Sequence, residues 1–315
     1  MEKCGVPFMT NADPADNIYV IDTRMFGFSR YCSAFLIAGN EIALIDTGPA
    51  TSAEFVRVGI EGHGFALEDI SYILITHIHF DHSGAAGILL KEMPKAKVMI
   101  HPRVLKHIID PSIVNANIKR DTGEIMAARF GELVPIPPSQ VQPLADGEVL
   151  DLGNGKRLRI IFAPGHHSSA IVILDEKNMG LFAGDAPGLY FADEDIVLMP
   201  SPPGCDLKQS IETLKVLMSI SPTKLFLGHY GICDEPKEMM RRALDAIQLR
   251  SDVGFEAIEQ GKQEELASRI IASIAPDIEK LRLRGESLYQ YIVEELIPVW
   301  ARGFIVYYQT LQKKH

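Results

Sequence analysis

Three histidines and an aspartate are concentrated in one short segment of the sequence, ITHIHFDHSG, at residues 75–84. His77, His79, Asp81 and His82 stand close together here, although the whole chain has only 10 histidines. Imidazole nitrogens and carboxylate oxygens are the usual protein ligands of zinc and of non-haem iron. The alternatives are a surface cluster of histidines or an aspartate that only caps a helix. The concentration of these residue types favours a metal site.

The elements around this segment predict how its side chains are placed. SYILITH (71–77) is a continuous apolar run typical of a buried strand, and SGAAGILLKEMP (83–94) predicts a helix whose small residues allow close packing. The first two histidines are two residues apart, so on an extended chain they point to the same side. Asp81 and His82 then lie on the turn that opens the helix. Such a corner can serve two ions, with one pair of ligands on each.

Three further residues follow apolar runs that resemble strands. His166 lies in FAPGHHSS, Asp185 in LFAGDAPG and His229 in LFLGHYG. Strand ends are where loops build functional sites, although one such histidine alone is more often a satisfied polar residue. Together with the first cluster they supply five histidines and two aspartates, a set that suits two metal ions. The two oxygens of Asp185 suit it to bridge both.

The rest of the chain must position these residues. Apolar runs predict strands at residues 18–23, 33–39, 41–48, 71–77, 96–102, 157–163, 169–176, 180–185 and 224–229, and helical spacing predicts helices at 51–64, 83–94 and 207–220. Residues 103–145 mix helical patches with proline and glycine breaks, which predicts an irregular helical insertion that overhangs a site. We therefore expect a layered catalytic domain at 1–235 and a helical region at 236–315.

Two segments of the second half are candidate walls of a pocket. The proline-rich loop DIVLMPSPPGC (195–205) follows Asp185. The helical region is rich in aromatic residues: Tyr289, Tyr291, Trp300, Phe304, Tyr307 and Tyr308. Such residues are more often core or dimer contacts than pocket residues. Capping of the site and formation of a homodimer are therefore both open roles for residues 236–315.

Bulk composition excludes some classes of function. The net charge of −10 disfavours nucleic-acid binding, which usually requires a basic face. No apolar run reaches the roughly 18–20 residues that cross a membrane, and the polar N-terminus lacks the apolar stretch of a signal peptide. We therefore expect a cytoplasmic protein without membrane association. The cysteines have no metal-binding spacing and predict incidental reduced thiols: Cys4, Cys32, Cys205 and Cys233.

The histidine and aspartate motifs resemble those of the metallo-β-lactamase-fold hydrolase superfamily, in particular its glyoxalase II-like and lactonase-like branch. The matching segments are LIDTG (44–48), THIHFDH (76–82), PGHHS (164–168), AGD (183–185) and GHYG (228–231). The resemblance spans about residues 17–231 and implies an α/β fold (α+β), a four-layer αββα sandwich with the metals at one edge of the paired sheets. The C-terminal helices would be an appendage to that core.

The resemblance also implies how the ligands are divided between two divalent ions. One ion would be held by His77, His79 and His166, and the other by Asp81, His82 and His229, with Asp185 bridging. Zinc is the expected metal, and iron or manganese are alternatives because the same ligands accept them.

The predicted reaction is hydrolysis of an ester, thioester or lactone of a small molecule. Two dications about 3.5–4 Å apart lower the pKa of a water held between them, and the resulting hydroxide attacks the carbonyl carbon. Asp81 would orient this water or accept its proton. His167, where the family usually has Thr or Ser, and Tyr190 are candidate proton donors to the leaving group. A supporting role beside the metal for His167 and a packing role for Tyr190 are the alternatives.

Three other functions fit the same residues. A phosphodiesterase could use the same metals, although the acidic chain shows no added nucleic-acid-binding module. An iron-dependent oxidoreductase is implied by the persulfide dioxygenase-like members of the superfamily that the motifs resemble. Those members use only the first site, so the presence of Asp81, His82 and His229 weighs mildly against it. A ligand-binding protein that has kept its metals is the non-enzymatic alternative.

Overall fold

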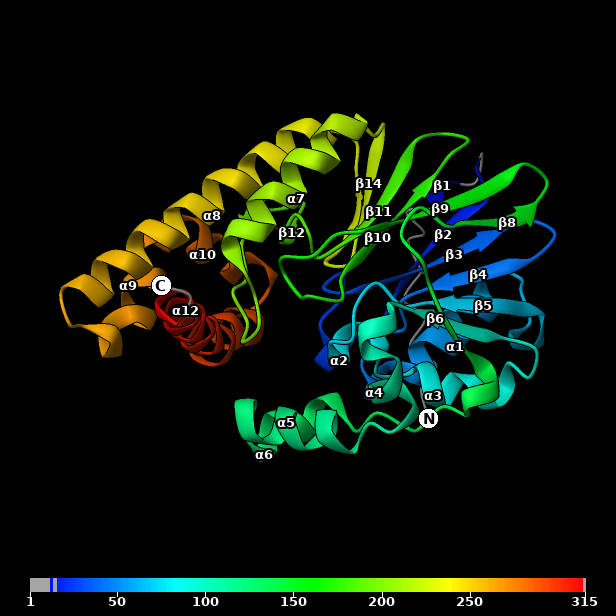
Figure 1. Cartoon of the computed structure of the whole chain (residues 1–315), viewed down its shortest axis with the longest axis horizontal. Coiled ribbons are helices and arrows are strands. Elements are labelled where there is room, and N and C mark those ends of the chain that lie inside the picture. Colours follow the sequence, from blue (N-terminus) through cyan, green and yellow to red (C-terminus); the bar gives the residue numbers. More distant parts are fainter. Residues whose placement is uncertain (1–11, 14–15, 314–315) are drawn as a thin grey trace.

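The structure is a computed structural model that describes residues 12–13 and 16–313. Two β-sheets lie face to face and helices cover their outer surfaces, which gives the αββα sandwich seen in Figure 1. The predicted four-layer α/β fold is therefore confirmed. The prediction for Cys4 lies outside the described residues, whereas Cys32, Cys205 and Cys233 are buried free thiols.

The first sheet is mixed. In the described part of the chain its strands follow the spatial order β1 (Ala12–Asp13), β2 (Ile18–Asp22), β3 (Ser33–Ala38), β4 (Ile42–Ile45), β5 (Ile70–Leu74), β6 (Lys97–Ile100) and β7 (Val141–Pro143). The pairs β1–β2, β2–β3 and β3–β4 are antiparallel. The pairs β4–β5, β5–β6 and β6–β7 are parallel. The carboxyl ends of β4 and β5 therefore lie at the same edge.

The second sheet presents several strand ends at one edge. Its described strands follow the order β15 (Gly231–Cys233), β14 (Lys224–Leu227), β11 (Gly180–Gly184), β10 (Ile171–Asp175), β9 (Lys156–Phe162) and β8 (Val149–Gly153). Strands β11 and β14 are parallel, and β9 and β11 are both antiparallel to β10. Because β9, β11 and β14 thus run in the same direction, their carboxyl ends share an edge. Strands β12 (Leu189–Phe191) and β13 (Ile196–Leu198) form a separate hairpin.

Alternating side chains make each sheet apolar on both faces. In β2, Ile18 and Val20 face the second sheet, whereas Ile21 packs with the helices on the outer side. Three aromatic rings pack together in the space between the sheets. The ring of Phe35 meets those of Phe182 and Phe226 edge-on, and its centroid lies 5.4 Å and 5.6 Å from theirs, respectively. This alternation has the period of two expected for strands buried on both faces.

The helices fall into two groups. The layered part of the chain holds α1 (Ala53–Gly62), α2 (Phe80–Ser83), α3 (Ala86–Leu89), α4 (Leu105–Ile109), α5 (Ser112–Thr122), α6 (Glu124–Phe130) and α7 (Leu207–Ile220). The remainder holds α8 (Pro236–Glu259), α9 (Leu266–Ser273), α10 (Ala275–Lys280), α11 (Glu286–Gln290) and α12 (Ile297–Gln312), and a π-helical turn (Tyr291–Leu296) joins the last two.

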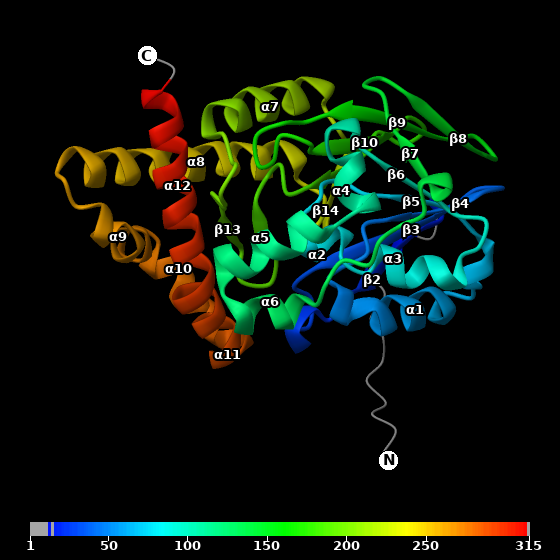
Figure 2. The same cartoon turned by 60° about the horizontal axis from the view of Figure 1, so that its bottom comes forward.

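The helices after residue 235 gather at one end of the sandwich, as Figure 1 shows. Turned by 60°, the same view places α12 beside the α5–α6 segment, which belongs to the predicted insertion (Figure 2). Within the described residues, no helix is long and apolar enough to cross a membrane. The division at residue 235 stays a prediction.

Most predicted elements are present, and the differences have local causes. The strand predicted at 41–48 ends at Ile45 because Asp46 turns the chain with a φ of 55°. The helix predicted at 83–94 is short: α3 is followed at once by a 3₁₀ turn, Leu90–Glu92. Close packing was predicted correctly for this segment, since a Cβ at Gly87 would lie 2.3 Å from the carbonyl oxygen of Val134.

Candidate metal centre

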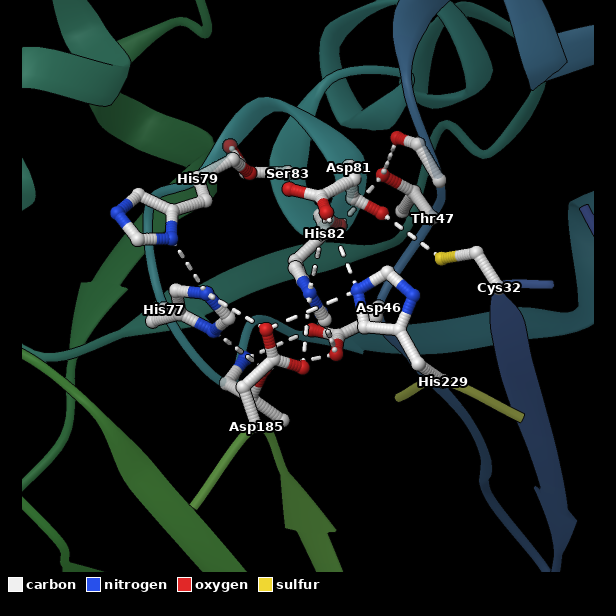
Figure 3. Close-up of polar contacts among 12 residues, drawn as sticks. Cys32, Asp46, Thr47, His77, His79, Asp81, His82, Ser83, Asp185 and His229 are labelled. Atoms are coloured by element: carbon white, nitrogen blue, oxygen red, sulfur yellow. Dashed lines mark hydrogen bonds and ion pairs between the residues drawn. The ribbon is translucent and has the colours of Figure 1, made fainter. Parts of the chain in front are cut away.

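The strand ends bring all seven predicted ligands to one edge of the sandwich. His77 and His79 lie in the loop after β5, and Asp81 and His82 lie in α2. The other three follow β9, β11 and β14, respectively: His166, Asp185 and His229. Figure 3 shows ligands from both sheets pointing toward one another. The backbone joins the sheets at this edge, where Ile171 N–H donates to the carbonyl of Thr76 at 2.9 Å.

Three imidazole nitrogens form the first group. The Nδ1 atom of His79 lies 2.9 Å from Nε2 of His77 and 3.0 Å from Nε2 of His166. A single N–H can satisfy only one of these contacts, so lone pairs otherwise face one another. A cation placed among the three nitrogens would accept all of the lone pairs. This group could hold a metal ion.

A carboxylate and two imidazoles form the second group. The Oδ2 atom of Asp81 lies 3.2 Å from Nε2 of His229 and 3.8 Å from Nε2 of His82. These ligand atoms also lie close enough together to hold an ion. The strand–turn–helix corner thus contributes one pair of residues to each group. Ligand atoms of His77 and His82 also lie together with one of Asp185, so the division between two ions stays a prediction.

Asp185 lies between the two groups. Its Oδ1 is 3.2 Å from Nε2 of His82, and its Oδ2 is 3.5 Å from Nε2 of His166 and 3.7 Å from Nε2 of His229. The carboxylate therefore reaches ligands of both groups. This position is the one that a bridging carboxylate requires.

A layer of polar contacts orients the ligand rings. Asp46 of the LIDTG motif accepts from Nδ1 of His82 at 2.8 Å and from the backbone N–H and hydroxyl of Thr76 at 2.8 and 2.7 Å. Nδ1 of His229 contacts the carbonyl of Tyr31 at 2.9 Å, so it donates and leaves Nε2 free to bind metal. Such contacts fix the tautomer of a metal-binding histidine.

Burial sets the charge of the first group. It lowers the pKa of His77, His79 and His166, and neighbouring histidines lower the pKa of all three further. The carboxylates of Asp81 and Asp185 oppose this shift at His79 and His166 without reversing it. These rings are therefore neutral near pH 7, which is the form that binds a metal ion.

The second group combines opposite charges. Burial disfavours the charged form of His82, but the carboxylates of Asp185 and Asp81 outweigh it and raise the pKa of the ring well above its usual value. Burial also opposes ionisation of the two aspartates, yet His82 and His229 hold their carboxyl pKa well below the usual range. Ionised carboxylates are thus balanced by protons on imidazoles. A cation entering the site would displace those protons.

The donor set fits a metal ion by a second criterion. Nε2 of His82 and Oδ1 of Asp185 are buried and face each other, yet neither makes a hydrogen bond of normal geometry. Buried polar atoms nearly always have partners. A cation at the centre of the cluster would satisfy both of these ligand atoms at once.

The remaining two predicted catalytic residues differ in position. His167 borders the cavity beside the first group, with its ring centroid 5.1 Å from that of His79. Tyr190 is not among the described residues that line the cavity. Its backbone N–H donates to the carbonyl of His229 at 2.7 Å, and its charged neighbours include Asp195 and Arg242. The structure thus brings His167, but not the hydroxyl of Tyr190, to the site.

A cavity of about 680 Å³ opens onto the ligands. The insertion contributes apolar wall residues, among them Val104, Ile113, Val114, Ile118, Met126 and Phe130. The C-terminal helices contribute Tyr291, Leu296, Pro298, Val299 and Trp300, and the proline-rich loop contributes Pro200, Pro202 and Pro203. The insertion therefore overhangs the site, and the loop forms a wall, as predicted.

Two residues at the site, Asp46 and Tyr31, were not predicted from the sequence to act there, and Tyr291 was named only among the aromatic residues of a possible pocket wall. Asp46 stands in a motif that the sequence analysis identified, so the signal was present. Tyr31 and Tyr291 both line the cavity, and their ring centroids are 5.8 Å apart. They come from opposite ends of the chain, and no local pattern distinguishes them from core tyrosines.

Comparison with known proteins defines the class. The model of the metallo-beta-lactamase superfamily matches residues 28–229, and the chain belongs to this superfamily. The match does not specify a branch, so the glyoxalase II-like or lactonase-like assignment stays a prediction.

Individual relatives agree with this class. The metallo-beta-lactamase fold-containing protein ST1585 of Sulfurisphaera tokodaii is 26% identical over 253 residues, which cover 76% of this chain and 90% of that protein. Its crystal structure superposes with a TM-score of 0.64 over 74% of this chain and 86% of the other. The probable metallo-hydrolase MJ0888 of Methanocaldococcus jannaschii is 28% identical over 67% of this chain and 93% of its own length.

A further structure shares the fold over nearly the whole chain. The metallo-beta-lactamase family protein TTHA1429 of Thermus thermophilus is 20% identical and has a TM-score of 0.66, with 94% of both chains covered. This likeness extends beyond the part matched by the superfamily model.

Proposed function

We propose that the protein is a dinuclear metal-dependent hydrolase that cleaves an ester, thioester or lactone bond in a small apolar substrate. The observation that carries this proposal is the convergence of seven nitrogen and oxygen ligands at a largely apolar cavity. An apolar wall beside a metal site suits a substrate with a hydrocarbon body and one polar reacting group. The net charge of −10 supports a small-molecule substrate over nucleic acid.

The residues of the first group would hold one ion and those of the second group the other, with Asp185 shared. Zinc is the metal we propose, although iron and manganese accept the same donors. When bound, such ions lower the pKa of a water molecule and polarise a substrate carbonyl.

Asp81 is the carboxylate that we propose orients the attacking water or accepts its proton. Its side chain is 19% exposed, compared with 4% for Asp185, so it faces the cavity while it also belongs to the second group. A carboxylate held ionised by neighbouring histidines can accept a hydrogen bond from water and orient it.

His167 would act as a neutral hydrogen-bond donor. Its Nδ1 accepts from the backbone N–H of Ser169 at 3.1 Å, so the proton of the neutral ring lies on Nε2. Burial, together with repulsion from the neighbouring His166 and His101 when these are protonated, lowers the pKa of His167 to about 4. At neutral pH the neutral ring can donate a hydrogen bond from Nε2 to the substrate or to a metal-bound neighbour.

Of the two roles expected for residues 236–315, we propose capping of the site. The support comes from Tyr291, Leu296 and Trp300, which line the same cavity as the ligands. The homodimer stays an untested prediction, as does the cytoplasmic location.

The test combines metal analysis with a substrate panel. Purified protein, loaded with zinc, iron or manganese, is offered p-nitrophenyl esters, thioesters, lactones and bis-p-nitrophenyl phosphate. We expect about two ions per chain and turnover of carboxylic substrates. Turnover of the phosphodiester alone would contradict the proposal in favour of a phosphodiesterase. Oxygen consumption by the iron form without hydrolysis would favour an oxidoreductase, and tight metal binding without any turnover would favour a ligand-binding protein.

A further inference from the structure

We propose that Tyr291 is a catalytic residue of this site, and that its hydroxyl donates a hydrogen bond to an oxygen of the substrate's acyl group. The inference rests on the proposed function insofar as it takes the substrate to be an ester, thioester or lactone. It concerns a residue outside the part of the chain that carries the metal ligands and outside the match to the superfamily model.

The position of Tyr291 in the backbone sets it apart from the other aromatic residues of the C-terminal helices. It is the first residue of the π-helical turn Tyr291–Leu296, between α11 and α12. Single π-helical turns inside α-helices occur frequently at functional sites. The side chain is 3% exposed, and it lines the cavity together with Asp81 and His229.

Rings from the opposite end of the chain hold Tyr291 in place. Phe26, Phe28 and Tyr31 have ring centroids 5.4, 5.7 and 5.8 Å from that of Tyr291. The guanidinium of Arg129 lies 5.3 Å from the same ring. A side chain enclosed on several sides is pre-organised, so it contributes a hydrogen bond to a ligand at little entropic cost.

Arg129 also ties the helical turn that carries Tyr291 to the insertion at residues 103–145. Arg129, in α6, also makes an ion pair at 3.1 Å with Glu295, in the π-helical turn. The ring of Tyr291 is therefore clamped where the insertion, the N-terminal loop and the C-terminal helices meet over the metal edge.

The hydroxyl of Tyr291 has a proton available for a ligand. Burial raises the pKa of both Tyr31 and Tyr291, so both stay protonated. The two side chains are also hydrogen-bonded to each other, and a phenol hydroxyl can accept one hydrogen bond while it donates another. Because Tyr291 lines the cavity, its proton would be available to a ligand there when Tyr31 donates to it.

The charge at the site identifies what this proton would meet. The charge of Asp81 raises the pKa of both tyrosines, so the donor is a neutral phenol at neutral pH. A neutral, buried donor beside a metal edge favours an oxygen that gains negative charge during the reaction, such as the carbonyl oxygen of an acyl group. A carboxylate product presents the same kind of acceptor.

The experiment measures binding of octanoate to the zinc-loaded full-length chain by calorimetry. In Tyr291→Phe we expect affinity to fall roughly tenfold or more, because a hydrogen bond to a charged group is lost. Zinc content and the thermal midpoint should match those of wild type, since the ring contacts remain. Tyr289→Phe is the matched control: it lies two residues away, and its hydroxyl bonds Glu279 at 3.0 Å instead of entering the cavity.

A second variant keeps the test decisive if Tyr291→Phe folds poorly. Tyr31→Phe removes the hydroxyl that is hydrogen-bonded to Tyr291. If Tyr31 polarises the hydroxyl of Tyr291, octanoate affinity should fall roughly two- to threefold. Unchanged octanoate affinity in folded Tyr291→Phe would overturn the inference, as would octanoate binding to neither wild type nor variant.

The two proposals can fail separately. If wild type hydrolyses nothing in the panel but Tyr291→Phe weakens octanoate binding, the proposed function fails and acyl recognition by Tyr291 stands. If wild type hydrolyses esters and Tyr291→Phe leaves both turnover and octanoate affinity unchanged, the hydrolase stands and the role of Tyr291 is refuted.

Discussion

Asp185 is the side chain on which both ligand groups depend, because its two oxygens reach histidines of each. Asp185→Asn replaces one of those oxygens with an amide nitrogen, which has no lone pair available to bind a cation. We expect the variant to lose most of the metal from one or both sites, and activity to fall at least about 100-fold, in line with the loss of a metal ligand.

Inductively coupled plasma mass spectrometry of the purified variant checks the metal content. Asp151→Asn, an exposed aspartate in β8, is the control and should retain the wild-type metal content. Full occupancy and activity in Asp185→Asn would contradict a bridging role.

A substitution at Gly228 tests the same site by steric crowding, without removing a ligand. A Cβ at this position would lie 2.7 Å from Cε1 of His82 and 2.8 Å from Oδ1 of Asp185. Gly228→Ala should therefore weaken metal binding roughly 10-fold or more, as disturbed ligand orientation does in other metal sites. A zinc titration with a chelating indicator measures the change. Gly62→Ala, where an added Cβ meets no atom within 4 Å, is the matched control, and equal zinc affinity in the two variants would refute the prediction.

At the residue scale, the ligands could be predicted because their chemistry is local. His77, His79, Asp81 and His82 stand together in the sequence, and each remaining ligand directly follows an apolar run. Tyr31 and Tyr291 could not be predicted in this way. Their place at the cavity depends on how distant elements pack. A buried tyrosine, whether in a loop like Tyr31 or in a helical turn like Tyr291, has the same sequence pattern when it faces a core as when it faces a site.

At the scale of elements, two glycines set how closely α12 approaches its neighbours. A Cβ at Gly303 would lie 1.9 Å from the carbonyl oxygen of Ser201, and a Cβ at Gly254 would lie 2.2 Å from the ring of Phe304. Gly303→Ala and Gly254→Ala should each lower the free energy of unfolding by about 1–3 kcal/mol, the usual cost of overpacking.

Urea denaturation measures these changes. Gly303→Ala carries an additional expectation, because Ser201 and Pro202 belong to the loop whose prolines line the cavity. Its octanoate affinity should fall along with its stability, whereas Gly254→Ala should affect stability alone. A stability equal to wild type in both variants would show that α12 is less tightly packed than described.

Element boundaries were predicted less well than element types. The strand predicted at 71–77 ends at Leu74, where Asp46 binds the backbone N–H of Thr76 and takes the chain out of the sheet. Short elements such as β7, β8, β12, β13 and β15 were not predicted at all. Their pairing depends on partners far away in the sequence, which a local pattern does not contain.

At the scale of the whole molecule, the ligand cluster sets a difference in stability between metal-free and metal-loaded protein. Binding to the folded state alone stabilises it by RT ln(1 + [L]/Kd), about 4 kcal/mol at 1,000 times Kd. We expect a chelator to lower the thermal midpoint and added zinc to restore it. Differential scanning calorimetry with and without the chelator provides the measurement, and Asp185→Asn should respond less than wild type. An unchanged midpoint in wild type would argue against metal binding at this site.

Each ligand group draws on both sheets: the corner at residues 77–82 comes from the first, and His166 and His229 come from the second. Neither half of the polypeptide can therefore assemble a complete coordination sphere by itself. Tight metal binding would therefore require the chain to have folded as a whole. Two separately produced fragments, each a poor chelator, would regain tight zinc binding only on reassociation.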